Sequence, residues 1–334
     1  MGEKREVLEG PSFSFVHKKL VKSTKRRKDM SVTVIIPTYK PGDKFLRLME
    51  GLKKQTLPPD KILIMNTEKK FWKDSVLRGM EQAEVIHISK EEFDHGRTRA
   101  QAAEMADSEF LIYFTQDAVP ADTCTIENLL KPFRDPEVGA VYGRQLPDKD
   151  CRLIERYTRS FNYPEKSRRK TRKDIPILGI KTFFCSNVCA AYRKEAYEKM
   201  GGFTFPTIFN EDMIMAGNMI KAGYAVFYAA DAQVIHSHNY TWLQQFKRNF
   251  DLAVSQADHP EIFKDVPSEE EGIRLVKSTC CYLIKKGRPW LFPQLVFSSG
   301  FKFLGYRMGK NYRKLPRRLV MKFTMNPDYW KKKN

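Results

Sequence analysis

Two acidic sites in the sequence have residue types that could do chemistry on a phosphate-bearing substrate. Asp117 follows residues 110–114, an apolar run that is typical of a buried strand. A carboxylate there could hold a Mg²⁺ or Mn²⁺ ion together with substrate phosphate oxygens. Glu211 and Asp212 begin a predicted helix, and Asp212 could accept a proton from a hydroxyl group. Each site also has a plainer interpretation, because aspartate is common in turns and acids are favoured in a first helical turn.

Two histidines lie at alternate positions, His236 and His238, directly after an apolar run that ends at Ile235. Alternate residues of an extended chain project to the same side, so both rings could face one site. They could complete a metal shell or contact a diphosphate, and we expect His238 to be the metal ligand. The sequence leaves open a purely structural role, which is common for a histidine near the end of a strand.

The elements that must position these residues follow a repeating strand and helix pattern. Apolar runs predict strands at 32–37, 61–65, 85–88, 110–114, 138–142 and 187–192. Apolar residues at helical spacing predict helices over about 45–52, 98–106 and 211–222. Because several strands are apolar on both faces, we expect an α/β fold with a mainly parallel sheet flanked by helices. Ligands bind beyond the carboxyl ends of such strands, so residues that follow the strands are the candidates for a site.

The charge balance narrows the class of partner. The formal net charge is +19 and the pI is about 9.6, which favours nucleic acid, anionic lipid or phosphorylated molecules as partners. No apolar run is long enough to span a bilayer, and residues 1–30 lack the apolar core of a signal peptide. We therefore expect a cytoplasmic protein with a basic leader (1–30), an α/β domain (31–259) and a helical C-terminal region (260–334).

The C-terminal region mixes aromatic and cationic residues, a composition that is typical of segments at a membrane surface. Each Lys or Arg near an anionic surface contributes about 1 kcal/mol. We expect peripheral contact with an anionic membrane, at the inner face of the plasma membrane. Alternatively, the region is a helical appendage that covers the sheet or joins two copies of the chain in a homo-oligomer.

Several short motifs occur in an order and spacing that together are specific. They are residues 34–39 (VIIPTY), 55–56 (QT), 93–99 (FDHGRTR), 115–118 (TQDA), 201–203 (GGF), 211–212 (ED) and 236–238 (HSH). In these motifs the chain resembles the inverting glycosyltransferases of family 2, which have the GT-A fold. More narrowly, it is similar to bacterial rhamnosyltransferases that use dTDP-rhamnose. The resemblance covers residues 32–256.

The resemblance implies roles for matching residues. Asp212 would be the general base, with Glu211 supporting it or binding the acceptor, and Asp117 would hold the metal. Thr115 stands where the family's metal motif often has a first acid. The residues implied in donor binding are Pro37, Thr38, Tyr39, Glu68, Asp94, Arg99, Gln116, Asn187 and Arg248.

Some of these donor-binding roles have alternatives. Asp94 would face the pyrimidine base, or it is a simple loop aspartate beside Gly96. Arg99 would contact the diphosphate, or it is a solvated helix charge. Asn187 would lie where the chain closes over the sugar, or it belongs to a plain turn. Arg248 would face the donor together with nearby residues of its helix, or that helix is simply amphipathic.

The implied function is transfer of L-rhamnose from dTDP-rhamnose to a saccharide acceptor, lipid-linked or polymeric, in the biosynthesis of a cell-surface polysaccharide. A UDP-hexose or a UDP-N-acetylhexosamine is the alternative donor. The charge also suggests a nucleic-acid-binding protein, but no nucleic-acid motif is present and the cations concentrate outside the α/β core, so nucleic acid is not expected as a partner. A catalytically silent scaffold is the third interpretation, because the metal motif has one acid.

Overall fold

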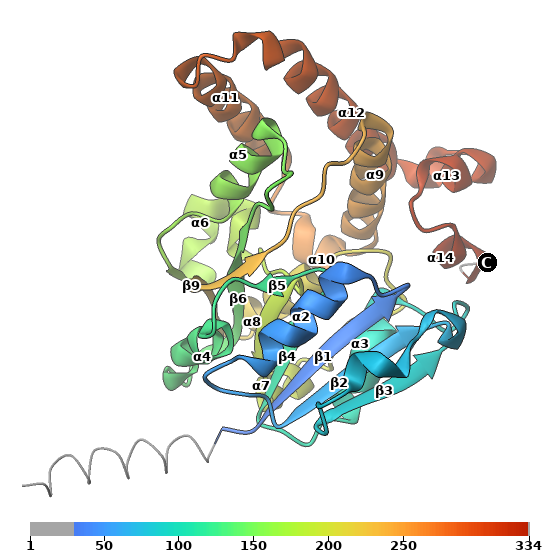
Figure 1. Ribbon diagram of the computed structural model, residues 1–334. Coiled ribbons are helices and arrows are strands. Elements are labelled where there is room, and N and C mark those ends of the chain that lie inside the picture. The colour runs from blue at the N-terminus through green and yellow to red at the C-terminus, as the bar shows by residue number, and fades with distance from the viewer. Residues whose placement is uncertain (1–29, 333–334) are drawn as a thin grey trace, which may run out of the picture.

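A nine-stranded sheet forms the centre of the protein in the computed structural model, which describes residues 30–332 (Figure 1). The predicted basic leader lies outside the described residues except for Met30. The strands are β1 (Val32–Tyr39), β2 (Lys61–Thr67), β3 (Ala83–Ile88), β4 (Phe110–Phe114), β5 (Val119–Pro120), β6 (Val138–Leu146), β7 (Arg168–Lys170), β8 (Cys189–Arg193) and β9 (Ala225–Ile235).

The sheet is mixed, and most of its paired length is parallel. Its order is β3-β2-β1-β4-β8-β6-β9-β5, with β7 also paired to β9. The first four strands in this order are parallel, as are β6 and β9, whereas β8 runs antiparallel to both β4 and β6. This agrees with the predicted fold class. The antiparallel strand was expected at 187–192 but begins at Cys189, so Asn187 lies in the preceding turn.

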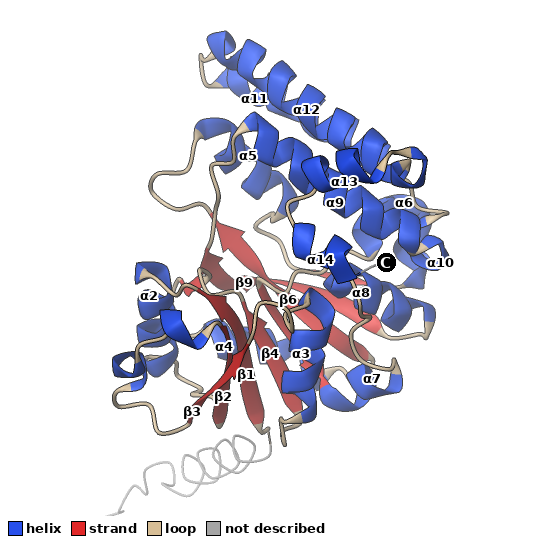
Figure 2. Cartoon of the chain, turned by 90° about the vertical axis from the view of Figure 1, so that its right-hand side faces the viewer, coloured by secondary structure: helices blue, strands red, loops and turns tan. Residues whose placement is uncertain are grey.

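Helices cover both faces of the sheet (Figure 2). On one face lie α2 (Asp43–Lys53) and α4 (Thr125–Leu130), and on the other lie α3 (His95–Glu104), α7 (Lys194–Lys199) and α8 (Glu211–Lys221). Strand alternation divides the core accordingly: Val34 and Ile36 pack with the α2 side, whereas Ile35 packs with the α8 side. The helix expected at 98–106 begins earlier, at His95, because Asp94 caps its first turn.

A group of helices stands over the carboxyl ends of the strands (Figure 2). It comprises α5 (Leu153–Asn162), α9 (Trp242–Asp258), α10 (Pro260–Phe263), α11 (Glu269–Lys285), α12 (Phe292–Lys310), α13 (Arg317–Phe323) and α14 (Pro327–Lys332). Two contacts tie α14 to the segment after β3: Lys90 pairs with Asp328 at 2.9 Å, and the Lys332 ammonium donates to the Phe93 carbonyl at 2.8 Å. Within residues 30–332, no helix is both long enough and apolar enough to cross a bilayer.

Helices α9 and α12 pack backbone to backbone. A Cβ atom added at Gly305 would lie 2.2 Å from the carbonyl oxygen of Phe246, and one added at Gly309 would lie 2.3 Å from that of Phe250. The residue numbers of the contacting positions increase together along the two helices, so the helices run parallel. Although the predicted domain boundary falls after residue 259, α9 packs along the helical region that follows this boundary.

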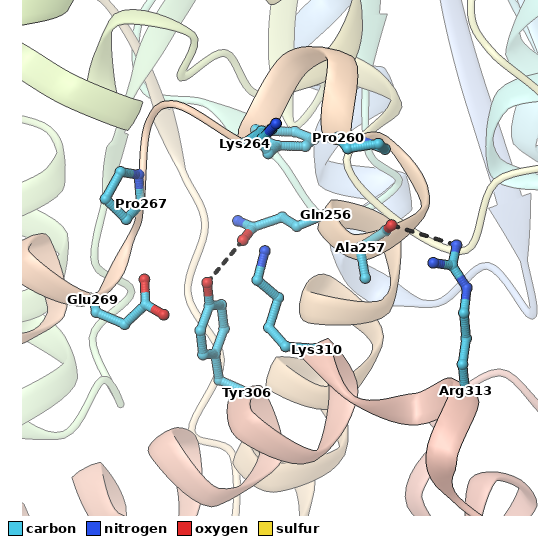
Figure 3. Close-up of a pocket in the computed structure, with 10 residues that line it drawn as sticks. Gln256, Ala257, Pro260, Lys264, Pro267, Glu269, Tyr306, Lys310 and Arg313 are labelled. Carbon is cyan, nitrogen blue, oxygen red and sulfur yellow. Dashed lines mark hydrogen bonds between the residues drawn. The ribbon is translucent and has the colours of Figure 1, made fainter.

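Farther along the same pair, side chains of α9, α10 and α12 line a cavity of about 390 Å³ (Figure 3). Gln256 comes from α9, Phe263 from α10, and Tyr306 and Lys310 come from α12. The cavity is therefore built mainly by the helical region.

Candidate active site

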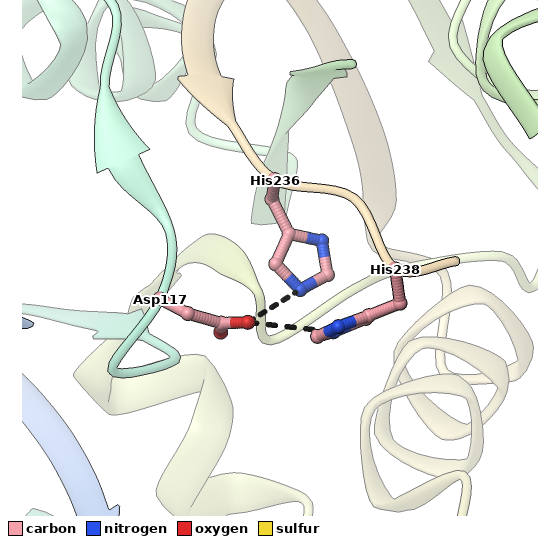
Figure 4. Close-up of side chains that lie close together, drawn as sticks. All are labelled: Asp117, His236 and His238. Atoms are coloured by element: carbon pink, nitrogen blue, oxygen red, sulfur yellow. Dashed lines mark ion pairs between the residues drawn. The ribbon is translucent and has the colours of Figure 1, made fainter. Parts of the chain in front are cut away.

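The first acidic group of the site lies where β5 pairs with the end of β9. Asp117 is in the turn between β4 and β5, and Val119 pairs with Ile235. This pairing brings the Asp117 carboxylate beside the two histidines that follow β9 (Figure 4). One oxygen of Asp117 lies 3.6 Å from Nε2 of His236 and 3.4 Å from Nε2 of His238. One ligand atom from each side chain lies within 4.8 Å of the others, which is the arrangement of a cation site.

Hydrogen bonds fix which nitrogen of His236 faces Asp117. The Gln145 amide nitrogen donates to the Tyr163 hydroxyl (2.6 Å) and to Ser186 Oγ (3.1 Å), so its oxygen faces the ring. Nδ1 of His236 lies 2.9 Å from that oxygen and must donate to it. Nε2 then keeps its lone pair toward Asp117, so the two facing atoms are both acceptors. Such a pair is stabilised by a cation between them.

Burial keeps His236 neutral. His236 is 6% exposed, and burial, reinforced by Arg159, lowers the pKa of His236 well below its usual value. Burial also lowers the pKa of His238, although Asp117 opposes this change. Neutral imidazoles are the form that binds metals.

The second acidic group begins α8. Asn210 precedes it with a left-handed backbone (φ 65°), which turns the chain so that Glu211 and Asp212 both face the turn before β8. The Asn187 backbone amide donates to Asp212 (3.0 Å), and its side-chain amide donates to Glu211 (3.3 Å). Arg99 pairs with Glu211 at 3.3 Å, and both residues are buried.

These two neighbouring carboxylates differ in proton affinity. Burial, together with the negative charge of Glu211, raises the pKa of Asp212 to about 7. Burial would also raise the pKa of Glu211, but the charges of Arg99 and His95 overcome it, so this pKa is lowered. Near neutral pH, Glu211 therefore stays ionised while Asp212 exchanges a proton readily. A general base needs a pKa close to the working pH.

The end of β1 is bound to the turn that carries Asp117. The Tyr39 amide donates to the Gln116 side chain and the Gln116 amide donates back to the Tyr39 carbonyl, both at 3.0 Å. Pro37 and Thr38 lie in the same strand, next to β2. The Tyr39 ring is 39% exposed and meets Phe71 edge to face at 5.6 Å. Pro37, Thr38, Tyr39 and Gln116 are thus brought to the side of the sheet that carries Asp117.

Glu68 and Asp94 are engaged elsewhere. Glu68 accepts from the Lys90 backbone amide (3.0 Å) and pairs with Lys70 (2.9 Å). Asp94 is 8% exposed, and its carboxylate accepts from three backbone amides, those of Gly96 (3.0 Å), Arg97 (2.9 Å) and Thr207 (3.2 Å). Neither side chain contacts the Asp117 cluster, and Asp94 is a helix cap rather than a plain loop residue.

Comparison with known proteins identifies the family of this chain. Residues 33–201 match Glycosyl transferase family 2. The chain is 41% identical to the O-antigen chain rhamnosyltransferase RfbN of Salmonella typhimurium (strain LT2) and 40% identical to the O-antigen chain rhamnosyltransferase WbaN of Salmonella anatum. Each match covers 90% of this chain and 96% of the relative.

The chain belongs to glycosyltransferase family 2. Among solved structures, the mannosyltransferase PcManGT of Pyrobaculum calidifontis, in complex with GDP-Man and Mn²⁺, is similar in fold, with a TM-score of 0.60. The match has 15% identity and covers 90% of this chain and 96% of that one. The GT-A fold, membership of the family and glycosyltransferase activity are therefore confirmed, and the interpretation as a silent scaffold is wrong.

Two arginines of this family 2 glycosyltransferase lie in different settings. Arg99 is 5% exposed and pairs with Glu211, so the alternative of a solvated helix charge is wrong. This ion pair is part of the second acidic group. Arg248, on α9, packs over the rings of Phe209 (4.6 Å) and Tyr240 (5.8 Å). Among residues 30–332, Arg248 has no carboxylate at ion-pair distance.

Sequence reasoning missed the residues that join the two acidic groups of the glycosyltransferase. Gln145 holds His236 and donates to Ser186, whose neighbour Asn187 holds Asp212. Arg159, on α5, also donates to Gln145. The signal was weak: Gln145 lies near the end of β6, which was expected to end at Tyr142.

Proposed function

We propose that this glycosyltransferase moves L-rhamnose from dTDP-rhamnose to a saccharide acceptor during synthesis of a cell-surface polysaccharide such as an O-antigen. The observation that carries the transfer chemistry is the presence of two acidic groups with different properties. One is a cation site at Asp117, and the other is a base at Asp212 with a pKa of about 7. The choice of rhamnose is supported by two relatives, 41% and 40% identical, whose names describe rhamnosyl transfer to the O-antigen chain.

The residues at the first group fit a divalent cation. Two neutral imidazoles and a carboxylate suit Mn²⁺, and Mg²⁺ would rely more on the carboxylate and phosphate oxygens. Asp117, His236 and His238 would hold the ion, which would neutralise charge on the leaving diphosphate. The structural neighbour solved with GDP-Man and Mn²⁺ supports this assignment.

Asp212 acts on the acceptor. Its carboxylate takes the proton of the attacking hydroxyl while the hydroxyl oxygen bonds to the anomeric carbon. The bond from that carbon to the diphosphate oxygen breaks, and its electron pair leaves with the diphosphate, so the configuration is inverted. Glu211 stays ionised and orients the acceptor or supports Asp212, and the Asn187 amide fixes the Asp212 carboxylate.

A different set of residues would bind the nucleotide-sugar donor. Arg248 has no ion-pair partner among the described residues and would contact the diphosphate. Pro37, Thr38, Tyr39 and Gln116 would form the nucleotide wall, with the exposed Tyr39 ring against the base. Glu68 and Asp94 would act from farther away by fixing the loop and helix that follow β2 and β3.

A donor screen tests this proposal. Purified protein with Mn²⁺ or Mg²⁺ and a lipid-linked acceptor mixture is given dTDP-rhamnose, UDP-glucose, UDP-galactose or UDP-N-acetylglucosamine, and release of nucleoside diphosphate is followed. We expect release from dTDP-rhamnose alone, lost with EDTA. Release only from a UDP-sugar would refute the rhamnose donor but keep the transfer chemistry.

We also propose that α12 binds an anionic membrane surface and brings the site to a lipid-linked acceptor at the cytoplasmic face. Val296 (66% exposed), Phe297 (54%), Phe303 (57%) and Leu304 (53%) are spaced i, i+1, i+7 and i+8, so they form one apolar stripe. Trp290, just before the helix, is 61% exposed, and Arg288 packs over its ring. Apolar side chains beside cations favour the headgroup region of an anionic bilayer.

Flotation with vesicles tests the membrane contact. We expect the protein to float with phosphatidylglycerol vesicles and not with phosphatidylcholine vesicles. The double variant Val296→Gln, Phe303→Gln should lose this binding, whereas Leu46→Gln, at an exposed leucine on α2, should keep it. Equal flotation of the double variant and the unmodified protein would refute the contact.

A further inference from the structure

The cavity between α9, α10 and α12 carries positive charge with few partners. Lys264, Lys310 and Arg313 line it, against a single carboxylate, Glu269 (Figure 3). Arg313 pairs with Asp258 at 2.8 Å, outside the lining. The other two cations have no carboxylate at ion-pair distance within the described part of the chain.

Neutral hydrogen-bonding groups form the rest of the polar lining. Gln256 is 4% exposed, and its oxygen accepts from the Tyr306 hydroxyl (3.1 Å) and from Ser268 Oγ (3.3 Å). The amide nitrogen has no hydrogen-bond partner between residues 30 and 332 and can donate to a ligand (Figure 3). A ligand oxygen in the cavity could accept a hydrogen bond from this nitrogen.

The lining matches two chemical groups on one ligand. A phosphate monoester carries about 1.5 to 2 negative charges at pH 7, which suits the two unpaired ammonium groups of Lys264 and Lys310. Hydroxyl groups could donate to Glu269 and accept from Gln256. Apolar walls from Pro260, Phe263 and Pro267 would cover the carbon skeleton. The volume of about 390 Å³ falls in the range of small-molecule sites.

This cavity is separate from the active site. Gln256 lies eight residues after Arg248 on α9, which at about 1.5 Å per helical residue is about 12 Å along the axis. None of the residues implied in donor binding lines the cavity. Its polar groups are therefore not explained by the transfer reaction.

We propose that the cavity is a second ligand site, which binds the phosphate ester of a polyhydroxy compound. Such a group occurs in soluble sugar phosphates and in lipid headgroups such as phosphatidylglycerol. The phosphate lies between Lys264 and Lys310, and the hydroxyl groups lie toward Glu269 and Gln256.

Calorimetric titration tests the site. Glucose 1-phosphate is titrated into the full-length protein with EDTA present, so that metal-dependent binding at Asp117 is suppressed. We expect a single site that Lys310→Gln weakens about tenfold, the effect of losing one charge-assisted hydrogen bond. Lys310→Arg should keep most of the affinity. Asp117→Ala and the surface control Lys277→Gln should leave it unchanged, and glucose should not bind.

A flotation arm separates the two sources of the ligand. If glucose 1-phosphate does not bind, but flotation with phosphatidylglycerol vesicles is weakened by Lys310→Gln and not by Lys277→Gln, the site takes a headgroup. If neither probe responds to Lys310→Gln, or if Asp117→Ala abolishes the titration as well, the proposal is overturned. Circular dichroism melts identify a variant that fails to fold, and for such a variant Lys264→Gln replaces Lys310→Gln.

Discussion

The two acidic groups of the active site contrast in how they are surrounded. Asp117 and its histidines meet from separate loops, and the Asp117 and His238 side chains are 22% and 36% exposed. Glu211 is buried, and Asp212 keeps only part of its surface open to solvent. The first group consists of acceptor atoms that face one another, whereas the second is held by amide donors and Arg99. The comparison indicates that a group open to solvent through Asp117 and His238 can take up a cation from outside, whereas the burial of the second group raises the pKa of Asp212.

The largest effect is expected from removing the base. Asp212→Asn cannot accept the acceptor proton, so we expect kcat to fall about 10³-fold. Binding of dTDP, measured by calorimetry, should be nearly unchanged, because Asp212 touches only the acceptor side of the reaction. The exposed Asp265→Asn is a matched control. Retained turnover in Asp212→Asn would remove this residue from the mechanism.

The next effect concerns the cation. Asp117→Ala removes the carboxylate between the two imidazoles, and Mn²⁺ affinity should drop by on the order of 100-fold or more, since outer partners of a metal site alone contribute 10-fold to 100-fold. Electron paramagnetic resonance of Mn²⁺ in the presence of dTDP measures this. Asp107→Ala, at an exposed acid after α3, should bind normally. Unaltered Mn²⁺ binding in Asp117→Ala would place the ion elsewhere.

A smaller effect is expected in the pH profile. Because the pKa of Asp212 is raised to about 7, its basic form is lost as pH falls, and kcat/KM should decline about tenfold per unit below pH 7. Arg99 lowers the pKa of Asp212, so Arg99→Gln should move the inflection to higher pH. An inflection near pH 4 in the unmodified enzyme would contradict the raised pKa.

The smallest effect concerns stability. A folded-state pKa above the unfolded value means that the protonated form of Asp212 favours folding, and this contribution is lost as pH rises from about 4 to about 7. Asp212→Asn has no such loss. Its Tm relative to the unmodified protein should therefore rise by on the order of a few degrees between pH 5 and pH 8. Calorimetric scans measure this, and a pH-independent difference would refute it.

The sequence predicted most of the sheet, because β1, β2 and β4 are runs of apolar residues that need no tertiary information. It also placed Asp117 and the histidines after strands, and the structure brings them together. It did not predict that β8 is antiparallel, nor the full length of β9, in which four alanines and Asp231 interrupt the larger apolar residues. Gln145 and Arg159 could not be found, because their role depends on the sheet register and on the position of α5.

The sequence also did not predict which charged residues contact each other. Arg99 was considered as a diphosphate ligand or a solvated residue, but a buried ion pair with Glu211 requires that two residues 112 positions apart meet. The contacts of Asp94 could not be predicted either, because the Thr207 backbone amide that donates to it lies in a loop that is distant in sequence. Local pattern predicts which residues begin or end an element, and long-range contacts then determine what each charge faces.

The glycine contacts between α9 and α12 also affect how the enzyme would sit on a surface. Because Gly305 and Gly309 bring α12 against the carbonyl groups of α9, the two helices cannot slide past each other without steric overlap. Because Arg248 lies on α9, a movement of α12 would move Arg248 with it. If that stripe docks, the angle of the whole catalytic sheet to the bilayer is set by the crossing of these two helices.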